Sequence, residues 1–156
     1  RQPTYIGCQV CDEWKYFMAF KSWMETQDWN DKELDKDLIG NGKLYSPDNC
    51  VFVSQALNKL FTDCGNARGD HPIGVYWEKA DKKYRARVAI NGKRKNLGLF
   101  TNPNDAHAAW YNAKLEIANG YLASESNPRV RYAIECGIEK LQCKYGGVLV
   151  NGAANH

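Results

Sequence analysis

The sequence lacks any apolar run near the roughly 20 residues that a membrane-spanning helix requires, so we expect no membrane partner. It also lacks a charged and then apolar leader, which favours a cytoplasmic protein over a secreted one. We find no internal repeat and no low-complexity segment. With 44% hydrophobic and 25% charged residues, the composition is typical of a folded chain and excludes disorder. Its 156 residues allow one ordinary domain or two small ones.

The sequence has no large excess of positive or negative charge overall, but its basic residues are concentrated in one segment. The net charge is only +3, whereas positions 79–95 contain eight lysines and arginines against one acid, and positions 25–37 are rich in acids. An anion-binding face requires basic charge that is gathered locally in this way. The segment 79–95 is therefore the first candidate for a binding surface.

Six cysteines could form three disulfides in a secreted chain, but without a leader we expect reduced thiols. Cys8 and Cys11 have the two-residue gap of a zinc knuckle, and Cys50 and Cys64 could complete a four-thiolate site. Because a second tight pair is missing, we favour the alternative that these cysteines are small apolar residues. Zinc is not the metal that we expect.

The first half of the sequence predicts a small helix, hairpin and helix unit over residues 1–63. Residues 13–24 have helical spacing, and their aromatic face is expected to lie in the core. This face contains Trp14, Phe17, Met18, Phe20 or Lys21, and Met24. Residues 34–38 and 45–53 read as extended pieces around the glycine-bearing turn 40–42, which predicts a hairpin. A helix over 54–61 follows, with Ser54 as its N-cap.

The second half predicts a three-stranded sheet and two helices, so the expected fold class is α+β. After a linker at 62–71, strands are expected at 73–78, 84–90 and 95–100, with Asn91-Gly92 as a two-residue type I′ turn. A helix from Pro103 to position 119, ended by Gly120, completes a unit over 72–121. The segment 122–156 adds a helix over 128–145 and a loose tail from 146.

Alternation in the middle strand predicts one packed face and one charged face. Tyr84, Ala86, Val88 and Ile90 alternate with Arg85, Arg87 and Ala89, so the apolar set should face the helix and both arginines the open side. A sheet about three strands wide can enter the major groove of DNA, where arginines read guanine and lysines hold phosphates. The alternative is a sheet whose outer face is simply hydrated.

Three segments of the second half resemble the ethylene-response-factor (Apetala) type of DNA-binding domain: GVY at 74–76, KYRARVAI at 83–90 and NLGLF at 96–100. An alanine-rich helix over 106–113 follows them, as in that family. The resemblance implies double-stranded DNA as the partner, contacted by Tyr76, Lys83, Arg85, Arg87, Arg94, Lys95 and Asn96. Asn96 and Arg87 differ from a tryptophan and an acid common in the family, so its target sequence is not carried over.

The segments GCQVCDEW at 7–14 and LDKDLIGNGKLYSPDNCVFV at 34–53 resemble phage-borne HNH-type homing endonucleases, which often carry the same sheet module behind them. The resemblance implies a ββα-metal unit that holds Mg²⁺ or another divalent cation, in the cytoplasm of an infected bacterium. Asp35 matches the metal-binding acid, Asn49 the asparagine that pins the loop, and Asn58 a helix position that supports the metal. Lys36 occupies the position of the general-base histidine.

Two readings of this N-terminal unit stay open. In the first, the chain is an HNH-type endonuclease in which Asp35, Lys36, Asn49 and Asn58 form the catalytic site. In the second, it is a catalytically inactive module that binds DNA or a protein, because a lysine with an ordinary pKa of about 10.4 is a poor base near neutral pH. Taken alone, Asp35 and Asp37 read as an exposed acidic strand end with Lys36 between them, and Asn49 as a turn residue. No small-molecule cofactor is expected, and a protein partner or homodimer stays open.

Overall fold

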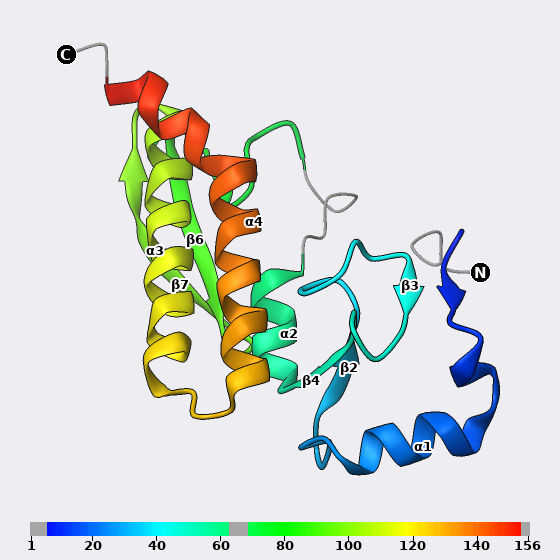
Figure 1. The fold of residues 1–156 in the computed structure, drawn as a ribbon. Helices are drawn as coiled ribbons and strands as arrows, with labels where there is room; N and C mark the ends of the chain where they lie inside the picture. Colours follow the sequence, from blue (N-terminus) through cyan, green and yellow to red (C-terminus); the bar gives the residue numbers. More distant parts are fainter. Residues whose placement is uncertain (1–5, 63–68, 154–156) are drawn as a thin grey trace.

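The computed structural model describes residues 6–62 and 69–153 and has an α+β fold, as the sequence predicted (Figure 1). A three-stranded antiparallel sheet is followed by two long helices, and a smaller N-terminal part contains short strands and helices. Across the described ranges, none of the helices combines the length and the apolar character that a membrane crossing needs. Most of the linker expected at 62–71 lies outside the described residues.

The three-stranded sheet consists of β5 (Val75–Glu78), β6 (Lys83–Ile90) and β7 (Lys93–Phe100), in that order. Asn91 and Gly92 connect β6 to β7 with φ angles of 50° and 77°. Positive φ at both positions is what a type I′ hairpin requires. The predicted two-residue turn is therefore confirmed.

One face of this sheet packs on α3 (Pro103–Ser124). Ala86 and Val88 of β6 are fully buried, and Val88 lies in one cluster with Trp110 of α3. Gly74 precedes β5 and approaches the same tryptophan so closely that an added Cβ would lie 2.2 Å from its Cγ. The predicted division of β6 into a packed face and an arginine face is confirmed.

α3 is longer than the sequence predicted. Gly120 was expected to end this helix but lies inside it, and the helix ends at Ser124. The reason is that Tyr121 and Leu122 continue the apolar stripe and pack against buried residues of the core. Glycine ends a helix when its left-handed backbone conformation is used, and Gly120 is helical here.

α4 (Pro128–Ala153) lies beside α3 and also exceeds its predicted length (Figure 1). The loose tail expected from position 146 is helical as far as Ala153, so that prediction was wrong. Gly146 shows why, because a Cβ at this position would lie 3.2 Å from the hydroxyl oxygen of Tyr111 on α3. The small residue lets the two helices continue side by side.

The first helical segment is broken where the sequence predicted one helix. A short 3₁₀ helix (Glu13–Lys15) is followed by Tyr16 in an extended conformation, and α1 (Phe17–Glu25) begins after it. An extended residue interrupts the helical hydrogen bonds and changes the rotation between the two pieces. Only part of the predicted stripe therefore faces inward.

The aromatic cluster of the N-terminal part is centred on Trp14, as expected, and it contains Phe20, which the helical spacing also allowed, and Trp23, which it did not include. The Trp14 ring lies 5.1 Å from the ring of Phe20 and 4.7 Å from that of Trp23. Phe17 and Met18, which were expected in the core, are 70% and 65% exposed. The break at Tyr16 accounts for the exposure of Phe17 and Met18.

The predicted hairpin exists, although its loop is longer than expected. β2 (Glu33–Asp35) pairs antiparallel with β4 (Val51–Val53), and residues 36–50 connect them. Within that loop, β3 (Leu44–Tyr45) instead pairs in parallel with β1 (Gln9–Val10). The chain leaves β2 at Asp35, whose side chain accepts the next backbone N–H groups and turns the chain.

α2 (Gln55–Phe61) follows β4 directly. The hydroxyl of Ser54 accepts a hydrogen bond from the backbone N–H of Leu57 at 3.2 Å, so the predicted N-cap is confirmed.

One hydrophobic core joins side chains from all three of the segments expected from the sequence. Its buried members are Leu38, Val51, Val53, Leu57 and Leu60 from the N-terminal part, Ala118 from α3, and Val130, Ala133, Ile134 and Ile138 from α4. The last helix therefore covers the apolar face of β4 and α2.

Two basic side chains of α4 strengthen the contact between α4 and the N-terminal part by donating hydrogen bonds to backbone carbonyls. Arg129 donates hydrogen bonds to the carbonyls of Cys50 and Pro47, and its guanidinium lies 5.8 Å from the ring of Trp23. Lys140 donates to three carbonyls of one loop, those of Asp37, Leu38 and Gly40. Both side chains fix the loop of the N-terminal hairpin to the C-terminal helix.

Candidate nucleic-acid interface and catalytic pocket

The register of the three-stranded sheet gathers most of the predicted DNA contacts on one face. It places Tyr76 opposite Arg85, Arg87 opposite Asn96, and Arg94 opposite Ala89. Directly opposite residues of antiparallel strands project from the same side of the sheet. Lys83 shares this side, since it alternates with buried residues of β6. We call this surface the outer face, and it is the one turned away from α3.

Lys95 is the exception among the predicted contacts. It lies opposite Val88, which is buried on the helix side of the sheet. The alternation of β7 therefore places Lys95 on the other face, although its side chain is exposed. Of the seven predicted DNA contacts, Lys95 alone does not share the outer face.

A β-bulge between Ala86 and Arg87 of β6 fixes the position of Asn96 on the outer face. Ala86 pairs with Gly98 and Arg87 with Asn96, so Leu97 has no partner in the register. The side-chain oxygen of Asn96 accepts the N–H of Gly98 at 3.2 Å, and Gly98 has a φ of 130°. Glycine tolerates this conformation, and the bulge holds the asparagine outward while Leu97 points into the core.

Arg85 is held by two acids on the outer face. Its Nε donates to Oε2 of Glu78 at 3.2 Å, and its Nη2 lies 3.7 Å from Oδ2 of Asp81. Arg87 has a different partner, because its guanidinium carbon lies 5.6 Å from the centre of the Tyr76 ring. One arginine of the pair is thus oriented by carboxylates and the other by an aromatic face.

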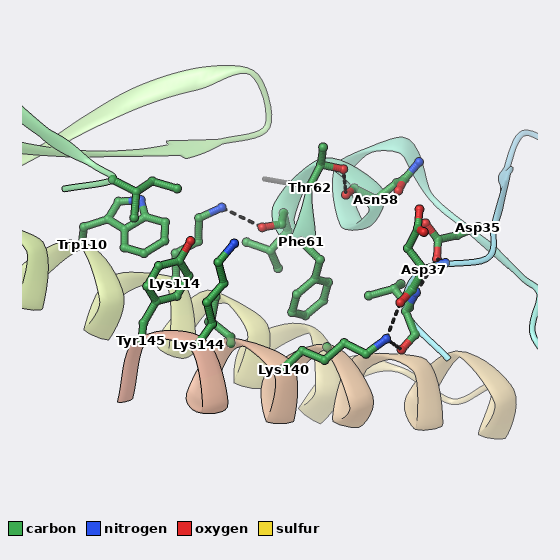
Figure 2. A pocket seen from close by; sticks show the side chains of 15 residues that line it. Asp35, Asp37, Asn58, Phe61, Thr62, Trp110, Lys114, Lys140, Lys144 and Tyr145 are labelled. Carbon is green, nitrogen blue, oxygen red and sulfur yellow. Dashed lines mark hydrogen bonds between the residues drawn. The ribbon is translucent and has the colours of Figure 1, made fainter. Parts of the chain in front are cut away.

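Two of the four residues predicted for catalysis, Asp35 and Asn58, line a pocket of about 320 Å³ between the N-terminal part and the two long helices, whereas Lys36 and Asn49 do not line it. Figure 2 shows Asp35, Asp37 and Asn58 at one end of this pocket, with Trp110, Lys114 and Tyr145 at the other. Between them, Lys140 reaches from α4 to the carbonyls of the loop that follows β2. The structure therefore brings together the two predicted metal ligands, Asp35 and Asn58, at one wall.

Asp35 ends β2 and is only 7% exposed. Its Oδ1 accepts the backbone N–H of Asp37 at 2.9 Å and that of Leu38 at 2.8 Å. Burial raises the pKa of this carboxyl more strongly than those two hydrogen bonds lower it. Asp35 is a buried, turn-forming acid, so the alternative of an exposed strand end is wrong for Asp35, although Asp37 is exposed.

Lys36 is also buried, and its ammonium is paired. Its Nζ lies 3.0 Å from Oδ1 of Asp37 and 5.4 Å from the centre of the Tyr45 ring. Burial alone would lower the pKa of Lys36, but the hydrogen bond and the charge of Asp37 outweigh it and raise the pKa above its ordinary value. A lysine with a raised pKa keeps its proton at neutral pH and cannot act as a general base there.

The two predicted asparagines have clear local roles. Asn49 donates from Nδ2 to the carbonyl of Leu44 at 3.4 Å, inside the loop between β2 and β4. A Cβ added at Gly40 would lie 3.0 Å from Cβ of Asn49, so the loop closes tightly on this side chain. Asn58 donates from Nδ2 to Oε2 of Glu33 at 2.7 Å, which ties α2 to β2.

The described residues contain no group of three or more histidines, cysteines or acids arranged to hold a metal ion. Of the four cysteines considered for zinc, Cys64 lies outside the described residues, and Cys8 donates weakly from Sγ to the carbonyl of Gly42. Cys50 is fully buried, and burial raises the pKa of its thiol to about 11. A thiol in that state is not a ready zinc ligand.

Sequence reasoning missed several residues of both surfaces. Asp81 was counted only as the single acid of the basic segment, and Glu78 was not considered, although strand alternation puts Glu78 on the same face as Lys83, its partner in the register. Lys140 and Lys144 of the pocket have the four-residue spacing of one helical face, which signals a shared surface but not what it faces. Nothing in the local pattern places Lys114 near the end of α2, where it donates to the carbonyl of Leu60 at 2.7 Å.

Comparisons of the chain with models of protein families, with curated proteins and with solved structures found no match.

Proposed function

We propose that the chain binds double-stranded DNA through the outer face of the β5-β6-β7 sheet. The observation that carries this proposal is the common exposed face of Tyr76, Arg87, Arg94 and Asn96, with Lys83 and Arg85 on the same side. These side chains combine donors for base edges, positive charge for phosphates and an aromatic ring. Such a combination suits DNA better than it suits a small anion.

The dimensions of the sheet agree with binding in the major groove. Neighbouring strands are about 4.8 Å apart, so three strands span roughly 10 Å, and the groove is about 12 Å wide. With α3 packed on the other face, the sheet is a supported slab whose outer side chains can reach base edges together. The resemblance to the ethylene-response-factor type of domain, in which the sheet is the reader, points to the same surface.

We further propose that the N-terminal part is an HNH-like scaffold, with β2, β4 and α2 as its ββα unit. The positions matched by Asp35 and Asn58 line one pocket, and Asn49 holds the loop between the strands. A divalent cation fits these residues only poorly as they lie. The amide of Asn58 is engaged by Glu33, and the raised pKa of Asp35 opposes the charged form that a metal needs.

Between the two readings of this scaffold, the environment of Lys36 favours DNA binding without hydrolysis. The lysine stands at the position of the general base, and its raised pKa keeps it protonated at neutral pH. Metal-dependent cleavage is the second candidate, and the shared pocket wall of Asp35 and Asn58 supports it. Activity would then require a base other than Lys36.

Binding is tested by retention of a labelled duplex in a gel-shift assay. Arg85→Ala combined with Arg87→Ala is expected to abolish retention while the unfolding midpoint stays unchanged. The matched control is Lys15→Ala combined with Lys43→Ala, which removes the same charge from exposed positions of the N-terminal part. Equal loss in both double variants would show that only net charge matters, and full retention by the arginine variant would move the binding site elsewhere.

Cleavage is tested separately on supercoiled and linear DNA with Mg²⁺ or Mn²⁺. We expect the parent protein to retain DNA without cutting it. Lys36→His restores a base with a pKa near neutrality at this position, and cleavage by this variant alone would identify Lys36 as the residue that silences the scaffold. Cleavage by the parent that is lost in Asp35→Ala would instead establish the endonuclease reading.

A further inference from the structure

Arg85 is the arginine of the outer face that lies within ion-pair distance of two carboxylates, those of Glu78 and Asp81. The three side chains are 20%, 33% and 47% exposed, respectively, so the group is partly shielded and still reaches solvent. Glu78 stands on β5, and Asp81 belongs to the turn between β5 and β6. The acids therefore belong to the same surface that the proposed function assigns to DNA.

Acids on such a surface work against general attraction to DNA. Each phosphate of the backbone is negative, and the affinity for duplexes of any sequence comes mainly from neutralising these charges. Glu78 and Asp81 lower that affinity by placing negative charge close to the phosphates. Their presence beside Arg85 therefore calls for a role other than attraction.

The contact with Glu78 restricts the guanidinium of Arg85 in a specific way. A guanidinium has five N–H donors in one plane, and Glu78 accepts from Nε. The donors of the two terminal nitrogens are those that bind O6 and N7 of guanine as a bidentate pair. An acceptor at Nε thus fixes the plane of the group. The carboxylate of Asp81 lies 3.7 Å from Nη2, which is beyond hydrogen-bonding distance, so the terminal nitrogens keep donors for the edge of a base.

Arg87 offers the comparison within the same strand. Its guanidinium lies over the ring of Tyr76, which is itself 45% exposed. Contact with a ring face restrains the group without occupying its N–H donors. Arg87 can therefore bind phosphates or bases in several orientations, whereas Arg85 is oriented before binding.

We propose that Glu78, supported by Asp81, is a specificity-determining positioning residue that orients Arg85 to read a guanine in duplex DNA. The inference rests on the proposed function, since it concerns how the outer face selects its DNA. Arg85 supplies preference for one base pair, and Arg87 and Arg94 supply affinity for all sequences. An oriented arginine loses less rotational freedom on binding, which sharpens the difference between a guanine and another base.

The test uses the full chain and two variants with the same change of charge. A pool of random 20-base-pair duplexes first identifies the preferred sequence of the parent protein. Binding is then measured by fluorescence anisotropy for this duplex and for duplexes in which each guanine is replaced in turn. Glu78→Gln keeps an acceptor for Nε of Arg85, and Glu78→Ala removes it, while both lose the negative charge.

We expect both variants to bind a duplex of unrelated sequence several-fold more tightly than the parent. Glu78→Ala alone should lose about tenfold of the preference for one guanine, the size of a good bidentate contact, and Glu78→Gln should keep most of it. Arg85→Ala should lose the preference for the same guanine, and adding Glu78→Ala to it should cause no further loss. The unfolding midpoints should agree, because exposed ion pairs contribute little to stability.

Three results separate failure of this inference from failure of the proposed function. A parent protein that retains no duplex at all refutes the proposed function itself. A parent that binds all duplexes equally well keeps that function and overturns the inference, because no preference exists for Glu78 to set. A Glu78→Ala variant with an unchanged preference also overturns the inference while DNA binding stands.

Discussion

Gly137 of α4 lies directly against the ring of Phe61, the last residue of α2. A Cβ added at Gly137 would lie 2.7 Å from Cε1 of that ring and 2.8 Å from its Cζ. The contact joins the C-terminal helix to the N-terminal part at the edge of the shared core. A glycine inside a helix, which is normally unfavourable, is here required by close packing.

Gly137→Ala is therefore expected to destabilise the protein by about 1 to 3 kcal/mol, because the ring must move to admit the methyl group. Gly120→Ala is the matched control, since a Cβ at this helical position meets no atom within 4 Å. That substitution should stabilise the protein by about 0.5 to 1 kcal/mol through helix propensity. Urea unfolding of both variants measures the two changes in the free energy of unfolding. Changes of the same sign in both variants would contradict the packing argument.

Arg129→Ala tests the joint between α4 and the loop of the N-terminal hairpin. Removing the guanidinium leaves the carbonyl of the buried Cys50 without its charged donor, so the free energy of unfolding should fall by about 2 to 3 kcal/mol. Arg129→Lys should recover only part of this loss, since an ammonium cannot reproduce the planar fork. Arg94→Ala, at an exposed position, should change stability by less than about 0.5 kcal/mol.

Asp35 gives the protein a pH-dependent element of stability. Burial raises the pKa of its carboxyl above the ordinary value of 3.8, so the folded state favours the protonated carboxyl relative to the unfolded chain. Ionisation therefore lowers stability as the pH rises from below 3.8 through the raised pKa. Above that window the cost is constant.

Asp35→Asn keeps an oxygen that can accept from the N–H groups of Asp37 and Leu38 but does not ionise. Relative to the parent, this variant should gain stability as the pH rises through that window, and the two should differ least below pH 3.8. Asp35→Ala loses the acceptor and should be less stable at every pH. Thermal unfolding measured between about pH 3 and pH 7 records this trend. A stability difference between variant and parent that does not change with pH would contradict it.

The salt dependence of DNA binding distinguishes the two faces of β7. Arg94 lies on the outer face and Lys95 on the helix side. Arg94→Ala should lower affinity for every duplex and reduce the slope of log affinity against log salt by about 1. Lys95→Ala should have a smaller effect. Equal effects would mean that DNA follows the edge of the hairpin and not its outer face.

The parts of the fold that could be predicted are those set by short-range rules. Asn91-Gly92 encodes its turn because both residues accept positive φ, and the alternation around Ala86 and Val88 encodes which face is buried. Ser54 also matches its predicted cap. In each case the physical cause lies within a few residues of its effect.

The parts that could not be predicted depend on contacts between distant segments. Gly120 looks like a helix stop until the core that receives Tyr121 is known. The exposure of Phe17 follows from a single extended residue at position 16, which helical spacing does not reveal. For the candidate site, the sequence named Lys36, but only the pairing with Asp37 shows which way its pKa moves.

The shared core also sets an order of events during protein synthesis. Val51, Val53 and Leu57 leave the ribosome well before Val130 and Ile134, the α4 side chains that complete their cluster. Until then, the newly made hairpin and α2 expose an apolar surface that can attract chaperones or other nascent chains. A premature stop in α4 would therefore be felt first in β4 and α2, whose apolar side chains would lack their last packing partner.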